Sequence, residues 1–504
     1  MSTVGEALAD LAPDDLGAHA LGRAQELGCE QAELRVERIR SQLLVLRDGR
    51  LETTVDDTST GMGLRVVRGG SLGFAATIDA RPAAAAALAD EATALARITG
   101  AALAGPVALA PEPVHGPVTW SSPYDVDPTE VPLAEKVALL SDWSGRLLAA
   151  PGVDHVSAYL FAVVDDKHYV DLAGTVTTQR RVRVHPALEA VAVHPTEGRF
   201  ESMRTLAPPV GRGWEYLAGT GWDWDAELTA IPELLAEKMA APSVDAGTMD
   251  LVIDPSNLWL TIHESIGHAT ELDRALGYEA AYAGTSFATP DKLGTLRYGS
   301  PVMQVVGDRT TEHGLATVGY DDEGVAAQAF DIVRDGVLVG YQLDRRIAAE
   351  HGYARSNGCA YADSPLHVPI QRMANVSLQP ARGEGPTTDE LVAGVDHGLY
   401  VVGDKSWSID MQRYNFQFTG QRFYRIEHGR LAGQVRDVAY QAQTTEFWGA
   451  LEAVGGRGTY VLGGAFNCGK GQPGQVAPVS HGCPSALFRG IRVLNARDES
   501  GGGA

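Results

Sequence analysis

The sequence predicts an α+β protein, with an N-terminal region of helices and antiparallel strands followed by a strand-rich C-terminal region. Two observations predict this class. Segments with apolar residues every three to four positions, as in helices, alternate with segments in which every second residue is apolar, as in strands. Short strand-like runs between glycine turns then dominate the second half. We expect an N-terminal region over 1–240, with sub-units 1–100 and 110–240, and a C-terminal region over 241–504.

The first sub-unit is predicted to be a helix, a set of strands and a second helix. Residues 14–28 have helical spacing, acidic residues at the start and a glycine at the end. Residues 31–78 form five short alternating runs separated by turn residues such as Asp48-Gly49, which indicates an antiparallel meander. Residues 82–98 are alanine-rich and return to helical spacing.

The second sub-unit is predicted to contain helices and strands after a linker. Residues 99–131 are rich in alanine, proline and glycine, which is typical of a linker or a surface excursion. Residues 133–149 and 226–240 have helical spacing, and four strand-like runs occupy 153–193.

The C-terminal region begins with a buried strand and a long apolar helix. The strand, residues 247–255, ends at a proline, after which Ser256 is the predicted N-cap of the helix. This helix is expected to end near Gly277, and many short strands with glycine turns follow as far as Val493.

Composition excludes several classes of function. The 504 residues contain 41 Lys and Arg against 64 Asp and Glu, a net charge of −23 that disfavours nucleic-acid binding. No secretory signal or apolar window long enough for a membrane span is found, so we expect no membrane partner. Four cysteines are too few for a disulfide scaffold, which agrees with a reducing cytoplasm.

The long helix contains two histidines and a glutamate in the pattern His-Glu-x-x-x-His. His263 and His268 offer the nitrogen ligands that suit zinc, and Glu264 can take a proton from water beside the metal. The usual spacing of four residues places two ligands about 40° apart on a helix, whereas a spacing of five places them about 140° apart. Both histidines therefore reach one metal only if the helix contains an extra residue at Ser265–Gly267, as in a π-bulge.

A catalytic zinc needs a third protein ligand. The residues alone leave four cysteines open as candidates: Cys468 in a glycine-rich loop, Cys483 together with His481, Cys29 and Cys359. Spacing favours Cys468 only slightly over Cys483.

The acidic and basic clusters elsewhere are predicted to have structural roles. Asp321-Asp322 is interpreted as a turn between strands rather than a second metal site. Arg180, Arg181 and Arg183 are expected on solvated or salt-bridged faces.

Taken together, these motifs resemble the TldD/PmbA metallopeptidase family, specifically its zinc-binding TldD type. The resemblance rests on His263-Glu264 with His268, on Asn467-Cys468-Gly469-Lys470-Gly471-Gln472, on Asp321-Asp322-Glu323-Gly324 and on Pro369-Ile370-Gln371-Arg372-Met373-Ala374-Asn375. It implies that Cys468 is the third Zn²⁺ ligand and that Glu264 is the catalytic base. It also implies cleavage of unfolded or extended peptides inside a homodimer or a heterodimer with a PmbA-type subunit, and in some members the maturation of ribosomally made peptides.

Two other functions remain as alternatives. One is a peptide-binding or regulatory subunit with a structural zinc, which a fourth protein ligand such as His481 or Cys483 would favour. The other is a hydrolase of non-peptide amides, which the spacing of the motif does not distinguish from a peptidase.

Overall fold

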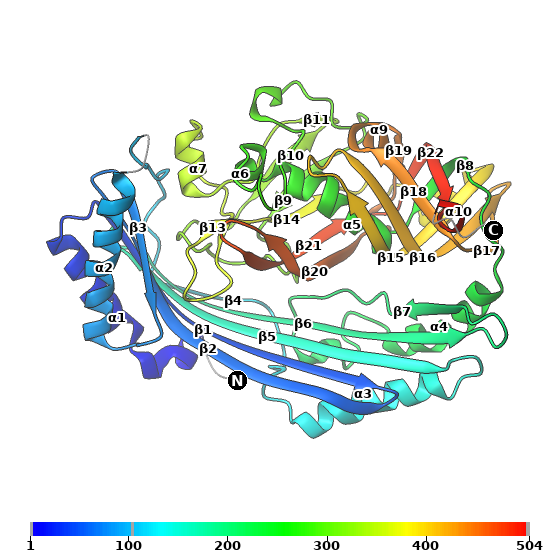
Figure 1. Ribbon diagram of the computed structural model, residues 1–504, viewed down its shortest axis with the longest axis horizontal. Coiled ribbons are helices and arrows are strands. Elements are labelled where there is room, and N and C mark those ends of the chain that lie inside the picture. The colour runs from blue at the N-terminus through cyan, green and yellow to red at the C-terminus, as the bar shows by residue number, and fades with distance from the viewer. Residues whose placement is uncertain (1–3, 102–104, 500–504) are drawn as a thin grey trace.

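The computed structural model describes residues 4–101 and 105–499 of the 504-residue chain. A sheet of very long strands from the N-terminal half lies alongside the smaller sheets and barrel of the C-terminal half (Figure 1). The predicted α+β class is confirmed.

The N-terminal sheet has the strand order β3-β2-β1-β5-β6-β4, with β7 also paired to β6. All neighbours are antiparallel except β4 and β6. The strands are β1 (Gln31–Arg47), β2 (Arg50–Arg68), β3 (Ser71–Thr77), β4 (Val118–Ser121), β5 (His155–Asp171), β6 (Val176–Val193) and β7 (Phe200–Arg204).

The predicted strands are correct in place but too short. The five runs expected over 31–78 form three strands, and the four runs over 153–193 form only β5 and β6. Arg40 and Ser41, which separate the first two predicted runs, continue the β1 ladder opposite Thr58 and Asp57. Pairing along both edges of β1 therefore overrides the local sequence preference.

Helices cover the two ends of this sheet (Figure 1). The predicted helices are confirmed, with their bounds shifted by at most two residues. Gly73 explains why β3 packs closely on the helix that contains Ala92. A Cβ at Gly73 would lie 1.9 Å from the Ala92 carbonyl oxygen, so only glycine lets the strand approach the second helix. The elements are η1 (Glu6–Leu11), α1 (Pro13–Glu26), α2 (Pro82–Gly100), α3 (Leu133–Leu148), η2 (Trp214–Tyr216) and α4 (Trp224–Ala240).

The C-terminal half contains a closed ring of strands. The order is β15-β8-β22-β18-β16, and β15 also pairs with β16, so the sheet closes on itself; β17 and β19 extend it. These strands are β8 (Gly247–Ile253), β15 (His397–Ile409), β16 (Asn415–Glu427), β17 (Arg430–Val435), β18 (Val438–Gln443), β19 (Leu451–Val454) and β22 (Ala486–Asn495).

Smaller sheets and short helices surround this ring. One sheet has the order β11-β10-β9-β14, and two pairs stand apart, β12 with β13 and β20 with β21. The strands are β9 (Val305–Asp308), β10 (Ala329–Arg334), β11 (Val337–Leu338), β12 (Ala360–Tyr361), β13 (Ile370–Gln371), β14 (Asn375–Leu378), β20 (Val461–Lys470) and β21 (Gln475–Cys483). The helices are η5 (Pro290–Lys292), α7 (Arg345–Glu350), α8 (Thr388–Ala393), α9 (Thr444–Gly449), η6 (Arg457–Thr459) and α10 (Ala496–Glu499). Across the described ranges, no helix is both long and apolar enough to cross a membrane.

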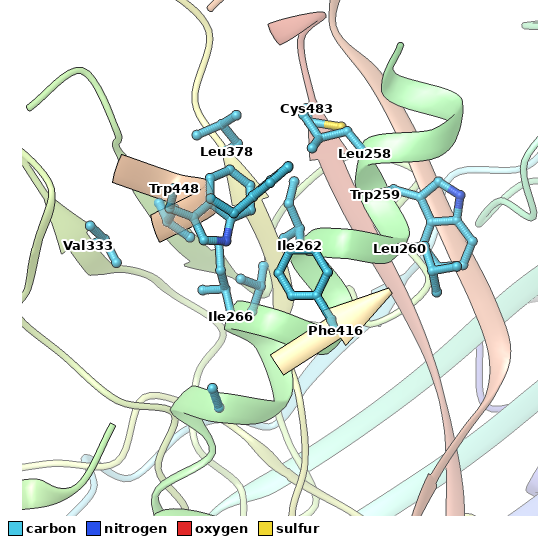
Figure 2. Close-up of a cluster of buried hydrophobic side chains, with 14 of the residues drawn as sticks. Leu258, Trp259, Leu260, Ile262, Ile266, Val333, Leu378, Phe416, Trp448 and Cys483 are labelled. Carbon is cyan, nitrogen blue, oxygen red and sulfur yellow. The ribbon is translucent and has the colours of Figure 1, made fainter. Parts of the chain in front are cut away.

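The long helix predicted after residue 255 is broken into four segments: α5 (Pro255–Ile262), the π-helical turn η3 (His263–Gly267), the 3₁₀ turn η4 (His268–Thr270) and α6 (Leu272–Ala275). The predicted cap is wrong by two positions, because Asp254 accepts the backbone N–H of Ser256. Leu258, Ile262 and Ile266 are completely buried, and Figure 2 shows them packed among Phe416 and Trp448. Burial of such side chains contributes about 1.5–3 kcal/mol each.

Buried ion pairs join the two halves of the chain. Asp322 lies 3.1 Å from Arg35 of β1 and 2.5 Å from Lys167 of β5, and all three side chains are at most 6% exposed. The turn predicted at Asp321-Asp322 therefore also holds the N-terminal sheet.

The arginine group on β6 is buried rather than solvated. Arg180 and Arg181 are each 5% exposed and pair with Asp166 and Asp165. Arg183, 4% exposed, faces Val163 and lies 3.8 Å from Asp165. Of the two alternatives, the salt-bridged one is correct, because β5 supplies a carboxylate opposite Arg180 and Arg181.

Candidate metal centre

The π-helical turn η3 brings the two histidines of the motif to the same side. The ring centroids of His263 and His268 are 4.6 Å apart, whereas a regular helix would direct the two rings away from each other. The helix defect expected at Ser265–Gly267 is therefore confirmed, and it extends over all of η3.

Side chains from distant parts of the chain hold this turn. The carbonyl oxygen of Ser265 accepts from the Tyr298 hydroxyl, and that of Gly267 accepts from Gln342 Nε2 at 2.7 Å. These bonds satisfy carbonyls at the place where the helical ladder changes. Gly267 has an ordinary helical φ of −52°, so its role is close packing: a Cβ there would lie 2.5 Å from Met373 Sδ.

A cysteine from a separate hairpin completes a set of three donors. The ligand atoms of His263, His268 and Cys468 all lie within 4.8 Å of one another, and the three residues are buried. Cys468 is on β20, next to a register shift after Ala465 in its pairing with β21. Such an irregularity re-aims side chains at functional sites.

Hydrogen bonds orient the histidine rings. His268 Nδ1 lies 2.8 Å from Glu271 Oε2, so Nδ1 carries the proton and Nε2 keeps its lone pair, 3.6 Å from Cys468 Sγ. Burial would raise the pKa of Glu271, but the Lys470 ammonium, 3.1 Å away, holds it well below its usual range. The carboxylate therefore stays ionised beside His268.

His263 is held by a third histidine. Its Nδ1 lies 2.7 Å from His481 Nε2, and His481 Nδ1 lies 2.8 Å from the Val376 carbonyl oxygen. Burial lowers the pKa values of His263 and His481, which favours the neutral imidazoles that metal coordination requires.

The donor set suits zinc. Two imidazole nitrogens and a thiolate are borderline-soft ligands of the kind found at catalytic zinc sites. Burial raises the pKa of the Cys468 thiol to about 11, although Arg372 opposes this effect with a guanidinium 3.2 Å from Sγ. A bound divalent cation supplies the positive charge that such a thiol needs to ionise.

The other cysteine candidates lie away from this donor set. Cys483 is buried in the apolar cluster of Figure 2, with Sγ 3.6 Å from the Pro255 carbonyl oxygen. Cys29 contacts Thr93 in the N-terminal half, and Cys359 is completely buried with a pKa raised by burial to about 12.

An arginine from a β-turn neutralises Glu264. Arg413 Nη1 lies 2.7 Å from Glu264 Oε2, and Nη2 donates to the Ala283 carbonyl oxygen at 3.2 Å. Arg413 has a φ of +62°, a left-handed conformation that a non-glycine residue adopts only at a cost. The turn between β15 and β16 thus places a cation against the carboxylate.

The donors open into a cavity of about 700 Å³ between the two halves of the chain. β20 lines one side of it from Val461 to Gly469, and aromatic residues of the N-terminal sheet line the other. Phe161 and Phe466 meet across it with ring centroids 5.1 Å apart. A second cavity of about 1110 Å³, walled by Trp143 and other residues of α3 and α4, adjoins the first. The two share Arg204, Leu206 and Trp222.

Sequence reasoning missed the roles of four residues that shape this site. Glu271 had a local signal, since it follows His268 by three positions in a helical segment. Arg413 had none, because it reaches Glu264 from 149 residues away. His481 was considered only as a metal ligand, and its contact with His263 218 residues away was not foreseen. Arg372 was noted only within a family-like motif, and its contact with Cys468 96 residues away was not foreseen.

An α+β chain with two histidines, a cysteine and an adjacent glutamate in a buried cavity is a candidate metallohydrolase. Family models identify it further: the PmbA/TldA metallopeptidase C-terminal domain matches residues 246–495, and domain 1 matches residues 32–96. A metalloprotease of Methanothermobacter thermautotrophicus is 30% identical over 474 residues, covering 92% of this chain and 95% of that protein. The chain therefore belongs to the PmbA/TldD metallopeptidase family.

Other relatives carry TldD names, and solved structures share the fold. The metalloprotease TldD homolog of Haemophilus influenzae is 25% identical over 92% of each chain, and the zinc metalloprotease TldD homolog of Saccharolobus solfataricus is 25% identical over 54% of this chain and 57% of its own. A putative modulator of a DNA gyrase from Thermotoga maritima has the same fold, with a TM-score of 0.75 at 15% identity over 95% of this chain and all of that one. TldE from Thermococcus kodakarensis gives 0.67 at 15% identity, over 95% of this chain and all of its own.

Proposed function

We propose that this chain is a zinc-dependent peptidase of the TldD type that hydrolyses unfolded or extended peptides. One observation carries the proposal: the converging donors of His263, His268 and Cys468 lie beside Glu264 at the wall of a cavity of about 700 Å³. A relative named a zinc metalloprotease supports the choice of metal.

His263, His268 and Cys468 would hold the zinc. When bound, zinc supplies Lewis-acid polarisation of a peptide carbonyl and lowers the pKa of water. Glu264 takes a proton from the attacking water at its carboxylate and passes it to the nitrogen of the leaving amine. Arg413, 2.7 Å from Glu264 Oε2, holds the carboxylate in place.

The free edge of β20 supports an extended substrate. β20 pairs only with β21 among the described strands, and its residues line the cavity that contains the donors. An unpaired strand edge offers backbone N–H and C=O groups to an added strand, so binding depends mainly on the peptide backbone. This geometry favours a peptide over a small non-peptide amide.

The three-donor set favours a catalytic zinc over a structural one. Structural zinc sites have four protein ligands, whereas catalytic sites have three. The two candidates for a fourth ligand are engaged elsewhere: His481 Nε2 lies 2.7 Å from His263 Nδ1, and Cys483 Sγ lies 3.6 Å from the Pro255 carbonyl oxygen.

We further infer that the protein acts in the cytoplasm as a homodimer or with a PmbA-type subunit, in peptide turnover or in the maturation of ribosomally made peptides. Two observations support this. The four cysteines are unpaired, and the ligand role of Cys468 needs a reduced thiol. The chain also shares its fold with a protein named TldE.

Metal content and peptide cleavage test the proposal directly. The purified chain, alone and with a PmbA-type partner, is analysed for zinc and incubated with unstructured peptides. Glu264→Gln should abolish cleavage and keep the zinc, whereas Glu312→Gln, a change at a carboxylate that is 77% exposed, should change neither. Normal cleavage by Glu264→Gln would refute the assignment of Glu264 as the base. A wild-type protein without zinc would refute the choice of metal.

A further inference from the structure

We propose that His481 is a positioning residue for the metal site: it selects the tautomer and ring orientation of His263 that directs Nε2 toward His268 and Cys468. This inference rests on the zinc binding proposed above. It assigns a role to a histidine that the motif does not contain.

The hydrogen-bond chain allows one arrangement of protons among neutral imidazoles. The Val376 carbonyl can only accept, so His481 Nδ1, 2.8 Å away, carries a proton. A neutral imidazole has one N–H, which leaves His481 Nε2 as an acceptor. His263 Nδ1, 2.7 Å from that nitrogen, must then donate. The remaining nitrogen of His263, Nε2, therefore has the free lone pair.

The two histidine ligands are oriented by chemically different partners. His268 Nδ1 pairs with the carboxylate of Glu271, which carries a charge and belongs to an ion cluster with Lys470. His263 Nδ1 pairs instead with a neutral imidazole. Partners of either kind fix the tautomer of a ligating histidine, and their loss typically costs 10- to 100-fold in metal affinity.

The surroundings keep the His481 ring in one place. His481 is completely buried and lies parallel to the Trp259 ring, with an interplanar angle of 11° and centroids 6.3 Å apart. The neighbouring Gly482 N–H donates to Ser377 Oγ at 2.9 Å, which ties β21 to β14. Since Cys468 is on β20, the hairpin of β20 and β21 supplies both a metal ligand and the partner of another.

Two substitutions separate hydrogen bonding from packing. His481→Phe keeps an aromatic ring against Trp259 but has no acceptor, whereas His481→Gln loses the ring but keeps an amide oxygen that can accept from His263 Nδ1. Each chain is titrated with Zn²⁺ against a chelator and with Co²⁺, whose visible absorption reports the ligand geometry. Thermal unfolding of the metal-free forms checks folding.

We expect His481→Phe to bind both metals about 10- to 100-fold more weakly than the wild type and to alter the Co²⁺ spectrum. His481→Gln should stay within about threefold of the wild type, because it restores the acceptor. Equal affinity of the Phe variant and the wild type would overturn the inference, as would a Gln variant no tighter than Phe. A wild type that binds neither metal would overturn both this inference and the proposed function.

A measurement on the unsubstituted protein guards against misfolded variants. Long-range ¹H–¹⁵N correlation spectra of the metal-free, histidine-labelled chain distinguish the two imidazole tautomers. The hydrogen-bond chain requires the Nδ1–H form for both His263 and His481. An Nε2–H form of either residue would contradict the proposal.

Discussion

Replacing Lys470 by methionine is expected to weaken both the fold and metal binding, because this ammonium group is the centre of a buried carboxylate cluster. Its Nζ lies 3.1 Å from Glu271, 2.8 Å from Asp273 and 3.7 Å from Glu279. Lys470 is 2% exposed, and the three acids are at most 6% exposed. Methionine has a similar length, so the change removes the charge and leaves little cavity.

The magnitude follows from this burial. Removing one partner of a buried ion pair costs about 3–5 kcal/mol, because the remaining charges stay desolvated. Within the described residues, Arg274 is then the remaining arginine or lysine in ion-pair contact with Glu271 and Glu279, and Asp273 loses its ion pair with Lys470. For a cooperative unit of about 250 residues this loss corresponds to a Tm about 6–20 °C lower. Zinc affinity should also fall about 10- to 100-fold, because Glu271 orients His268.

Chemical and thermal unfolding of the metal-free proteins test the stability, and chelator competition tests the affinity. Arg334→Met is the matched control, because it removes an ion pair with Asp331 in which the side chains are 59% and 40% exposed. Exposed pairs contribute at most about 1 kcal/mol. If Lys470→Met destabilises the protein no more than the control, the reasoning from buried charge is refuted.

Three further changes test the site. Cys468→Ser should lose zinc. The control Cys29→Ser should keep it, because the wild-type Cys29 Sγ lies 3.4 Å from a threonine hydroxyl in the N-terminal half. Full zinc occupancy in Cys468→Ser would contradict the ligand assignment. Arg413→Gln should lower kcat about 10- to 100-fold, the equivalent of one charge-assisted hydrogen bond to Glu264, and an unchanged kcat would exclude this role. Burial lowers the pKa of His185 to about 3, so the unfolded chain binds a proton below pH 6.5 that the folded chain does not. The free energy of unfolding should therefore fall by at most about 1.4 kcal/mol per pH unit between pH 6.5 and 3. Denaturant unfolding should show a weaker fall with pH for His185→Phe than for the wild type. Equal slopes for the two proteins would contradict this assignment.

Much of the fold could be predicted because the patterns are local. The apolar spacing in α1, α2, α3 and α4 placed all four helices to within about two residues, since one face of each must be buried. The lengths of β1 and β6 could not be predicted in the same way. Polar residues in their middle are stabilised by partners on the neighbouring strands, which the local pattern does not contain.

The candidate metal site also has a part that local spacing predicts and a part that only the fold decides. The spacing of five between His263 and His268 required a helix defect at a stated place, because the geometry of an α-helix excludes a shared ligand position. The residues alone left Cys468 and Cys483 nearly equivalent, and only the fold separates them by directing one to the histidines and the other into the apolar cluster.

The sequence by itself indicated the fold class and the position of the π-turn, because apolar spacing and the spacing of His263 and His268 are local patterns. Only the tertiary structure decided which partners hold those groups. Arg413 and His481 reach the motif from 149 and 218 residues away, and strand pairing brings them there. The physical reason is that long-range packing chooses the hydrogen-bond partners of buried polar groups, and those partners select the charge and tautomer of each functional side chain.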